Sequence, residues 1–306
     1  MDKTLINEGV MFEFDIFVSS SSNSGLKIFK GKNSVITNND ITILSSIEEI
    51  FIQEKYKERY KMSLKTITQS ISSKEDRKEE FEKHSKEIYS NATLVLENLF
   101  DNPETLGNYE NSKSVVNDLV GNILDDDFTL KSLMHIAEHD FYTHTHSLNV
   151  AIYSMCLGSF LKLDQKALAE LGESALLHDL GKSKIDPAII NKDGKLTDKE
   201  FRTMMAHSSL GYTIGLKIGI KNKNVLHGIK YHHEKMDGTG YPEGLLGTGI
   251  PLFARIIGLC DIFDALTSKR SYKEAMTTFE AVKLIKTHMS GHVDLKLLNS
   301  LLLMFR

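Results

Sequence analysis

Histidines and aspartates recur at five places in the second half of this 306-residue chain, with spacings that could place them at one metal site. The stretch from His232 to Gly244 reads HHEKMDGTGYPEG, so two adjacent imidazoles precede a loop rich in glycine. In HDLGK, His178 and Asp179 stand together and Lys182 follows three residues later. Imidazoles and carboxylates together suit borderline divalent metals such as iron, manganese or zinc. The pattern therefore indicates metal chemistry, if the fold brings these residues together.

Five predicted helices would place these residues on their inward sides. Asp164 is an N-cap signal for a helix that reaches His178, and Gly181 is expected to end that helix in the left-handed conformation. A capping box that begins at Thr197 opens the helix that leads to His207. Both imidazoles follow the apolar face of their helix, so we expect them to face the interior.

The other ligand-type residues show the same periodicity. His232 and His233 lie seven and eight residues after Val225, Asp261 lies within the apolar segment that Pro251 begins, and His146 precedes the apolar face of a long helix. Any one of them alone is better explained as a satisfied polar residue of the core. Burying all of them unpaired would be costly, so the whole set favours two metal ions that share a carboxylate. The candidate ligands are His146, His178, Asp179, His207, His232, His233 and Asp261.

The remaining histidines divide into two groups. Three lie close enough to His146 in sequence that spacing leaves them open as ligands, namely His135, His139 and His144. The others are expected to be surface or packing residues: His84, His227, His288 and His292.

Composition is that of a soluble globular protein. Hydrophobic residues make up 41% and charged residues 25%, and the net charge is −4. This balance argues against nucleic-acid coating and against binding to a membrane surface. The two cysteines, Cys156 and Cys260, cannot form a disulfide framework and suit a reducing compartment. With no signal peptide and no apolar run of membrane-spanning length, a cytoplasmic protein is expected.

The chain has the pattern of two domains joined by a helical linker. Residues 1–62 read as a small α/β domain, and residues 63–111 read as a connecting helix that ends in a turn over 101–112. In the first domain we expect strands over 11–18, 26–31 and 48–53 and helices over 38–47 and 54–62. From 112 to 306 apolar residues recur at intervals of three and four. The expected fold class is therefore mainly α.

Four motifs, taken in order, resemble the HD-GYP family, a branch of the HD phosphohydrolase superfamily. They are HDLGK, KDGKLTDKEFRTMMAHSSLG, HHEKMDGTGYPEG and IPLFARIIGLCDIFDALTSKRSYKEA. The resemblance covers residues 112–306 and is specific, because the HD, HH and GYP motifs and the distal Asp-Ala-Leu-Thr segment occur together. It implies a bacterial signalling hydrolase in which a helical HD-type catalytic domain over 112–306 follows a small regulatory or interaction domain.

The resemblance also implies two metal sites, with iron as the expected metal and manganese as the alternative. Its first site would consist of His146, His178, Asp179 and Asp261. Its second site would consist of His207, His232, His233 and again Asp179, which would bridge the two ions.

By the same resemblance the substrate is cyclic di-GMP, cleaved by a hydroxide held between the two ions. Asp179 and Lys182 would be catalytic, Lys182, Arg270 and Lys273 would contact the scissile phosphate, and Tyr241 would line the pocket. Candidate partners are diguanylate cyclases of the GGDEF type, other signalling proteins and a second copy of the chain. The alternative function is a weakly active or inactive module that senses a nucleotide and contacts proteins.

Two positions depart from the family pattern. Many relatives have tryptophan where this chain has Met236, so base stacking there is expected to be weaker. Some relatives hold a third ion with a glutamate four residues before the first ligand histidine, a place that Tyr142 takes here. Because a neutral phenol is a poor ligand for a divalent ion, we expect two ions and the linear dinucleotide pGpG as the main product.

Overall fold

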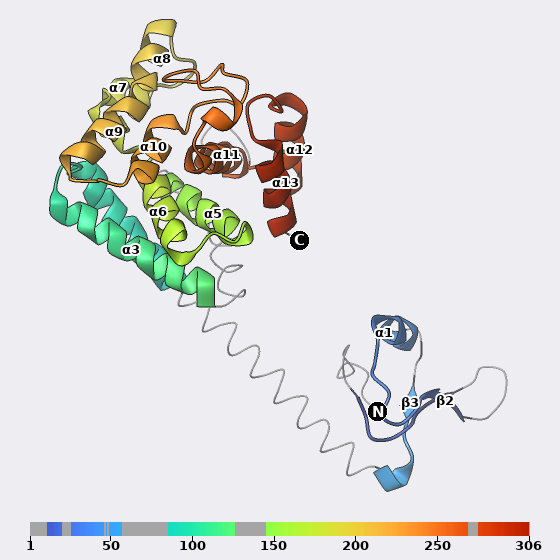
Figure 1. Ribbon diagram of the computed structural model, residues 1–306. Coiled ribbons are helices and arrows are strands. Elements are labelled where there is room, and N and C mark those ends of the chain that lie inside the picture. The colour runs from blue at the N-terminus through green and yellow to red at the C-terminus, as the bar shows by residue number, and fades with distance from the viewer. Residues whose placement is uncertain are drawn as a thin grey trace. The chain divides into compact units, whose positions relative to one another are not determined.

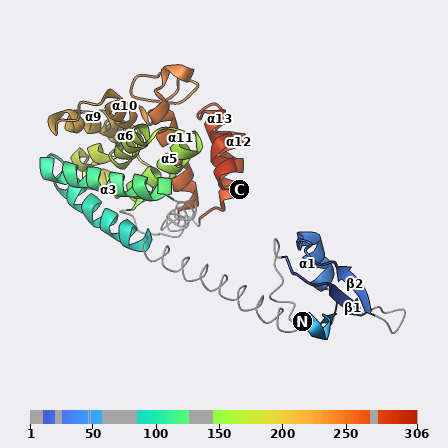
Figure 2. The same cartoon turned by 60° about the horizontal axis from the view of Figure 1, so that its bottom comes forward.

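The structure is a computed structural model that describes residues 11–19, 26–45, 47, 49–56, 85–125, 145–268 and 275–305. The chain divides into two compact units, Met1–Glu80 and Phe81–Arg306 (Figures 1 and 2). The fold class predicted from sequence is confirmed, because a small three-stranded sheet in the first unit precedes a helical second unit. Within the described residues, no helix combines the length and apolar character needed to cross a membrane.

The first unit is built on an antiparallel sheet in the order β2-β1-β3. Its elements are β1 (Ile16–Ser19), β2 (Leu26–Lys30), α1 (Asn38–Ser45), β3 (Ile50–Phe51) and a 3-10 turn, η2 (Glu54–Tyr56). Strand β1 begins later than predicted, because the preceding residues bond to a turn instead of the sheet. Asp15 Oδ1 accepts the Lys32 amide at 2.7 Å, and the Phe12 carbonyl accepts the Asn33 amide at 2.8 Å. None of the candidate ligands lies in this unit.

The second unit is a helical bundle around one hydrophobic core. Residues 85–101 are helical. The named helices that follow are α3 (Leu106–Asp125), α5 (His146–Phe160), α6 (Gln165–Leu176), α7 (Pro187–Ile190), α8 (Asp198–Met205), α9 (His207–Lys217), α10 (Lys223–Tyr231), α11 (Leu252–Thr267), α12 (Thr278–His288) and α13 (Leu295–Met304). Two 3-10 segments are η3 (Leu180–Lys184) and η4 (Gly247–Gly249).

Helices α5, α6, α10 and α11 form the centre of this bundle. Helix α5 packs against both α6 and α11, and α10 packs against α6, α9 and α11. Nearly the whole of α5 is buried, from Ser147 to Gly158, so its first residue, His146, stands at the end of a central helix. Helix α3 covers α6 and α5 on the outside (Figure 2).

The predicted turn over 101–112 is wrong in its second half. The break between the two helices spans only residues 102–105, and α3 is already helical from Leu106. The start of α3 is fixed because the Tyr109 hydroxyl donates to Glu173 Oε1 on α6 at 2.7 Å. Tyr89 and Leu96, from the helix before the break, belong to the same core as α5 and α6. The domain limits at 62/63 and 111/112 stay a prediction.

Local signals at the helix starts were predicted correctly, but the role of Gly181 was not. Asp164 caps α6, and the capping box at Thr197 opens α8. Gly181 was expected to end a helix in the left-handed conformation, but it lies in η3 and is not among the residues with positive φ. Glycine is required there because a Cβ would lie 1.9 Å from the carbonyl oxygen of His207.

Gly258 marks a second close approach between backbones, at the end of α10 that carries His232. A Cβ on Gly258 in α11 would lie 2.4 Å from the carbonyl oxygen of His232 at the end of α10. These two approaches bring η3 next to α9 and α11 next to α10. The helices can therefore place their polar residues in one small volume.

Candidate metal centre

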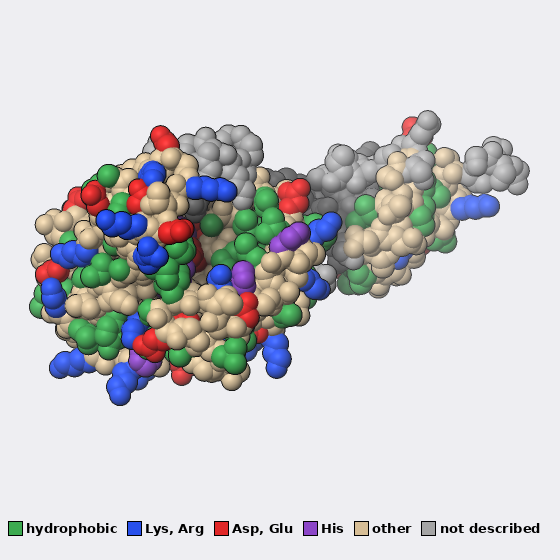
Figure 3. All heavy atoms as spheres, turned by 90° about the horizontal axis from the view of Figure 1, so that it is seen from above, with side chains coloured by type: hydrophobic (Ala, Val, Ile, Leu, Met, Phe, Trp, Pro, Cys, Tyr) green, Lys and Arg blue, Asp and Glu red, His purple; other side chains and the backbone are tan. Residues whose placement is uncertain are grey.

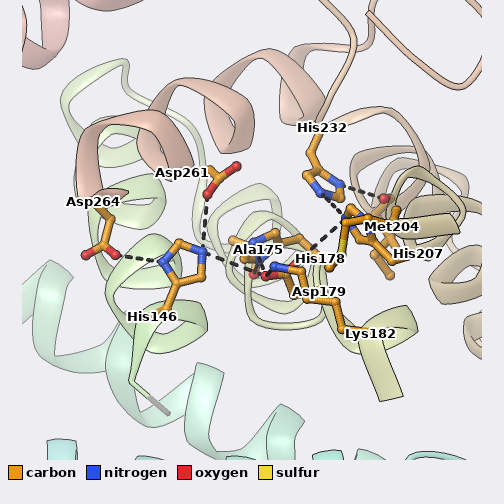
Figure 4. Close-up of polar contacts among 11 residues, drawn as sticks. His146, Ala175, His178, Asp179, Lys182, Met204, His207, His232, Asp261 and Asp264 are labelled. Carbon is orange, nitrogen blue, oxygen red and sulfur yellow. Dashed lines mark hydrogen bonds and ion pairs between the residues drawn. The ribbon is translucent and has the colours of Figure 1, made fainter. Parts of the chain in front are cut away.

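The seven candidate ligands of the sequence lie together in the second unit. Figure 4 labels all of them except His233. Six of them form two groups in which one ligand atom from each residue lies within 4.8 Å of the others. We call His146, His178 and Asp179 the first triad, and His207, His232 and His233 the second triad. Asp261 joins the first triad, because its Oδ1 lies 3.2 Å from His146 Nε2.

Asp179, a member of the first triad, also reaches the second triad. Its Oδ2 is 3.4 Å from His178 Nε2 and 3.8 Å from His146 Nε2. Its Oδ1 is 3.4 Å from His207 Nε2. One carboxylate oxygen is therefore offered to each triad.

Backbone carbonyls fix the ring orientation of three of the histidines. In His178, His207 and His232, Nδ1 lies 2.7, 2.7 and 2.8 Å from the carbonyl oxygen three residues earlier. Because a carbonyl can only accept, each Nδ1 must carry a proton, and in a neutral ring Nε2 then offers a lone pair. This is the tautomer that metal-ligating histidines commonly adopt.

The spacing of these lone pairs fits metal ions. His207 Nε2 and His232 Nε2 lie 3.2 Å apart, although both are acceptors and cannot hydrogen-bond to each other as neutral rings. Ligands about 2.0–2.1 Å from one ion, at tetrahedral to octahedral angles, lie about 2.9–3.4 Å apart. Two buried atoms, His178 Nε2 and Asp179 Oδ1, have no hydrogen-bond partner within the described residues. Cations bound here would accept the lone pairs of His207 and His232 and would interact with these two buried atoms.

His146 is oriented by a carboxylate rather than by a carbonyl. Its Nδ1 lies 2.7 Å from Oδ2 of Asp264, which is 1% exposed and also accepts the Ser268 hydroxyl at 2.9 Å. Burial opposes the charge on His146, but hydrogen bonds to Asp261 and Asp264 outweigh it and raise the pKa of His146 to about 10. Asp264 was not among the residues predicted from sequence. Its position three residues after Asp261, on the same helical face, was the available signal.

The second triad consists of neutral imidazoles. Burial holds the pKa of His207 below its ordinary value, and burial together with neighbouring histidines holds that of His232 well below it. Burial lowers the pKa of His233 to about 4. Burial alone would raise the pKa of Asp179, but the charge of Lys182 and contacts with His178 place it well below its usual range. Near neutral pH the site therefore offers a carboxylate and three unprotonated rings.

The candidate substrate residues are only partly described. Lys182 Nζ donates to Asp179 Oδ2 at 2.5 Å, and the Tyr241 ring centroid lies 4.7 Å from that of His233. Burial, followed by the charges of Asp261 and Asp179, raises the pKa of Tyr241, so its phenol stays neutral. The other residues proposed for this region lie outside the described residues: Arg270, Lys273 and Tyr142.

Tyr241 stands on the loop 235–247, which we call the GYP loop. Glu234, immediately before it, is 8% exposed and accepts three consecutive backbone amides of the loop. The Tyr241 amide donates to the His233 carbonyl at 3.3 Å, and the Met236 amide donates to the His292 carbonyl at 3.0 Å. Glu234 was not among the residues predicted from sequence, although it directly follows the two candidate ligand histidines.

The described histidines outside the two triads have other neighbours. The ring of His227 lies 5.5 Å from that of Tyr231, His288 bonds to the Thr287 hydroxyl, and His292 lies 3.8 Å from Asp237. The remaining four lie outside the described residues: His84, His135, His139 and His144.

One face of the second unit is hollowed, and Figure 3 shows acidic and basic side chains together with apolar ones around the hollow. Lys182 and Tyr241 are half-buried, whereas His178 and His232 are almost fully buried. The candidate centre thus has histidines at its base and a lysine and a tyrosine nearer to solvent.

Comparison with known proteins gives matches for this helical unit. Residues 129–297 match the HD domain family. A cyclic di-GMP phosphodiesterase of Pseudomonas aeruginosa is 36% identical over 183 residues, which are 60% of this chain and 44% of that protein. A 3'3'-cGAMP-specific phosphodiesterase of Vibrio cholerae is 38% identical over 153 residues, which are 50% of this chain and 33% of that protein. These matches span less than half of either relative.

A solved structure shares the fold over nearly the whole chain. It is that of an HDG"Y"P protein from Bdellovibrio bacteriovorus, with a TM-score of 0.61 and 20% sequence identity. The match covers 97% of this chain and 96% of that chain. At this level of sequence identity the likeness shows a shared fold.

Proposed function

The chain belongs to the HD domain family, and from that membership we propose that it is a metal-dependent phosphodiesterase that hydrolyses cyclic di-GMP. The observation that carries the proposal is the position of Asp179, which offers one carboxylate oxygen to each of two ligand triads. Cyclic di-GMP is the substrate class in the name of a relative 36% identical to this chain. A cyclic dinucleotide has the phosphodiester that a two-metal site is suited to cleave.

Each triad would hold one ion. Asp261 would complete the set around the first triad, and Asp179 would belong to both sets. When bound, the ions supply Lewis acidity, which lowers the pKa of a water and offsets phosphate charge. The mixed imidazole and carboxylate set suits iron, with manganese as the alternative.

The protein's own groups would position the phosphodiester and balance its charge. Lys182 is 34% exposed in its side chain and ion-paired with Asp179, so its ammonium lies between the ligands and the solvent-facing side. From there it can contact a nonbridging phosphate oxygen and stabilise charge that develops during attack. Tyr241, held neutral, can donate a hydrogen bond or pack against a base. We assign Arg270 and Lys273 to the phosphate as well, on the family resemblance.

Two ions position one phosphodiester at a time, so we propose pGpG as the main product. Two groups of candidate ligands lie within the described residues, and this number supports a site for two ions. Tyr142, the residue at the place of a third-ion ligand in some relatives, offers only a neutral phenol. Further cleavage to GMP should accordingly be slow.

A second candidate substrate follows from the comparison. A relative that is 38% identical to this chain is named as specific for 3'3'-cGAMP, which differs from cyclic di-GMP in one base. The same metal chemistry would serve both dinucleotides. The choice between them would depend on contacts to the bases.

The test is hydrolysis by protein purified anaerobically and loaded with Fe²⁺ or Mn²⁺. Cyclic di-GMP and 3'3'-cGAMP are supplied separately, and the products are separated by chromatography. We expect consumption of cyclic di-GMP and accumulation of pGpG. Cleavage of 3'3'-cGAMP alone would change the substrate and keep the reaction class. If two ions are bound and neither dinucleotide is consumed, the chain is better explained as a nucleotide-sensing module.

A further inference from the structure

Glu234 holds the GYP loop through three consecutive backbone amides. Its Oε1 accepts the amides of Glu243 at 2.7 Å and Gly244 at 3.1 Å, and its Oε2 accepts the amide of Leu245 at 2.9 Å. Consecutive amides that converge in this way form a site for an anion, and here the protein's own carboxylate fills it. Hydrogen bonds to an ionised carboxylate are stronger than neutral ones, so this contact fixes the second half of the loop.

The anchored loop brings Tyr241 against a candidate metal ligand. The chain leaves Glu234, returns through the loop, and the Tyr241 amide donates to the His233 carbonyl at 3.3 Å. The ring centroids of Tyr241 and His233 then lie 4.7 Å apart at an interplanar angle of 31°. Tyr241 thus covers one side of the His233 ring.

His233 needs this contact more than the other histidines do. Each of the other four has its Nδ1 hydrogen-bonded, three to carbonyl oxygens and His146 to Asp264. Within the described residues, no hydrogen bond reaches a ring nitrogen of His233. Its ring instead packs against His207 at 4.9 Å, His232 at 4.1 Å and Tyr241.

We propose that Glu234 is a positioning residue for the second triad: by anchoring the GYP loop, it keeps the Tyr241 ring packed on His233 and so holds that ligand in place. The inference rests on the metal site of the proposed function. It assigns Glu234 a role in metal affinity that is separate from any contact with substrate. A histidine ligand whose second ring nitrogen has no hydrogen bond is oriented by packing alone. Loosening that packing should therefore lower the affinity for the ion.

The main test is Glu234→Gln, which keeps the size of the side chain but replaces one acceptor oxygen with an amide donor. That donor would face a backbone N–H, because all three loop contacts are made by amides. Mn²⁺ binding is measured by calorimetry, and amide hydrogen exchange is followed at residues 243–245 in the metal-free protein. We expect faster exchange there and about tenfold weaker binding of one of two Mn²⁺ ions, with the other unchanged.

Three matched variants separate positioning from general stability. Tyr241→Ala should lower the affinity for the same ion, whereas Tyr241→Phe keeps the ring and should bind both ions normally. Glu173→Gln changes a partly buried glutamate remote from the GYP loop, whose hydrogen bond is to Tyr109 on α3, and should leave the binding of both ions unchanged. If Glu234→Gln fails to fold, the two Tyr241 variants still decide the question.

The outcomes that overturn the inference differ from those that overturn the proposed function. Faster exchange in Glu234→Gln with unchanged Mn²⁺ binding would refute the role of Glu234, and so would normal binding in Tyr241→Ala. A wild-type chain that binds fewer than two Mn²⁺ ions would refute both proposals. Two bound ions without hydrolysis of a cyclic dinucleotide would refute the proposed function alone.

Discussion

Replacing Gly181 by alanine should disrupt the metal centre without changing any ligand. The added Cβ would lie 1.9 Å from the His207 carbonyl oxygen and 2.5 Å from the Gly211 amide nitrogen. Both are backbone atoms, so no side-chain rotation can relieve the contact. Real Cβ atoms essentially never approach closer than 3.0 Å, so η3 and α9 must separate by at least 1.1 Å.

That separation acts on the shared carboxylate, because Asp179 immediately precedes η3 and His207 begins α9. Asp179 Oδ1 and His207 Nε2 are 3.4 Å apart, already at the upper limit for two ligands of one ion. A further separation of this size would take Asp179 out of reach of the second triad's ion. Overpacking in a close-packed core also costs about 1–3 kcal/mol, which corresponds to a fall in Tm of roughly 2–12 °C for a unit of this size.

The assay combines elemental analysis of the metal-loaded protein with thermal unfolding. We expect Gly181→Ala to retain one ion or none and to unfold at a lower temperature. Gly121→Ala is the control, because nothing lies within 4 Å of a Cβ there. It should keep both ions, and its free energy of unfolding should rise by about 0.4–1 kcal/mol. Two retained ions and an unchanged Tm in Gly181→Ala would refute the link between this close approach and the site.

Three further predictions concern Lys182, Asp264 and the N-terminal limit of the helical unit. Lys182→Ala should keep both ions but lose activity, because Lys182 is assigned to the phosphate; loss of metal from a folded variant, seen by elemental analysis, would contradict this. In metal-free protein, the protonated His146 stabilises the fold fully below pH 6.5, and this contribution is lost as pH rises through about 10. Asp264→Asn should therefore lower the His146 pKa measured by NMR and flatten this loss, and an unchanged pKa would argue against the contact. A chain that starts at Phe81 should fold and bind metal. A chain that starts at residue 105 should aggregate, because it lacks Tyr89 and Leu96 of the core. Equal metal content in the two chains would show that those residues are dispensable.

The sequence could predict which residue types face inward, because helical periodicity fixes the face on which a side chain lies. His178 and His232 fall on buried faces, and the structure places both beside the other ligand-type residues. Periodicity says nothing about which helices meet. The close approaches at Gly181 and Gly258 depend on the packing of separate elements, so the need for glycine there is visible only in the folded structure.

The supporting residues were harder to predict than the candidate ligands. Asp264 and Glu234 act by accepting hydrogen bonds from groups distant in sequence, His146 in one case and the loop amides in the other. A single aspartate or glutamate beside a motif is usually a solvated surface charge, so nothing in the pattern around these two residues favoured burial. The length of the turn before α3 was overestimated for a similar reason. The start of α3 depends on the contact between Tyr109 and Glu173, which joins two different helices.

Anomalous diffraction from crystals of the metal-loaded protein would test the shared carboxylate most directly. We expect two peaks, one beside each oxygen of the Asp179 carboxylate, with the first near His146 and the second near His232. A single peak, or two peaks of which only one contacts Asp179, would contradict the shared carboxylate. A third peak beside Tyr142 would contradict the two-ion site.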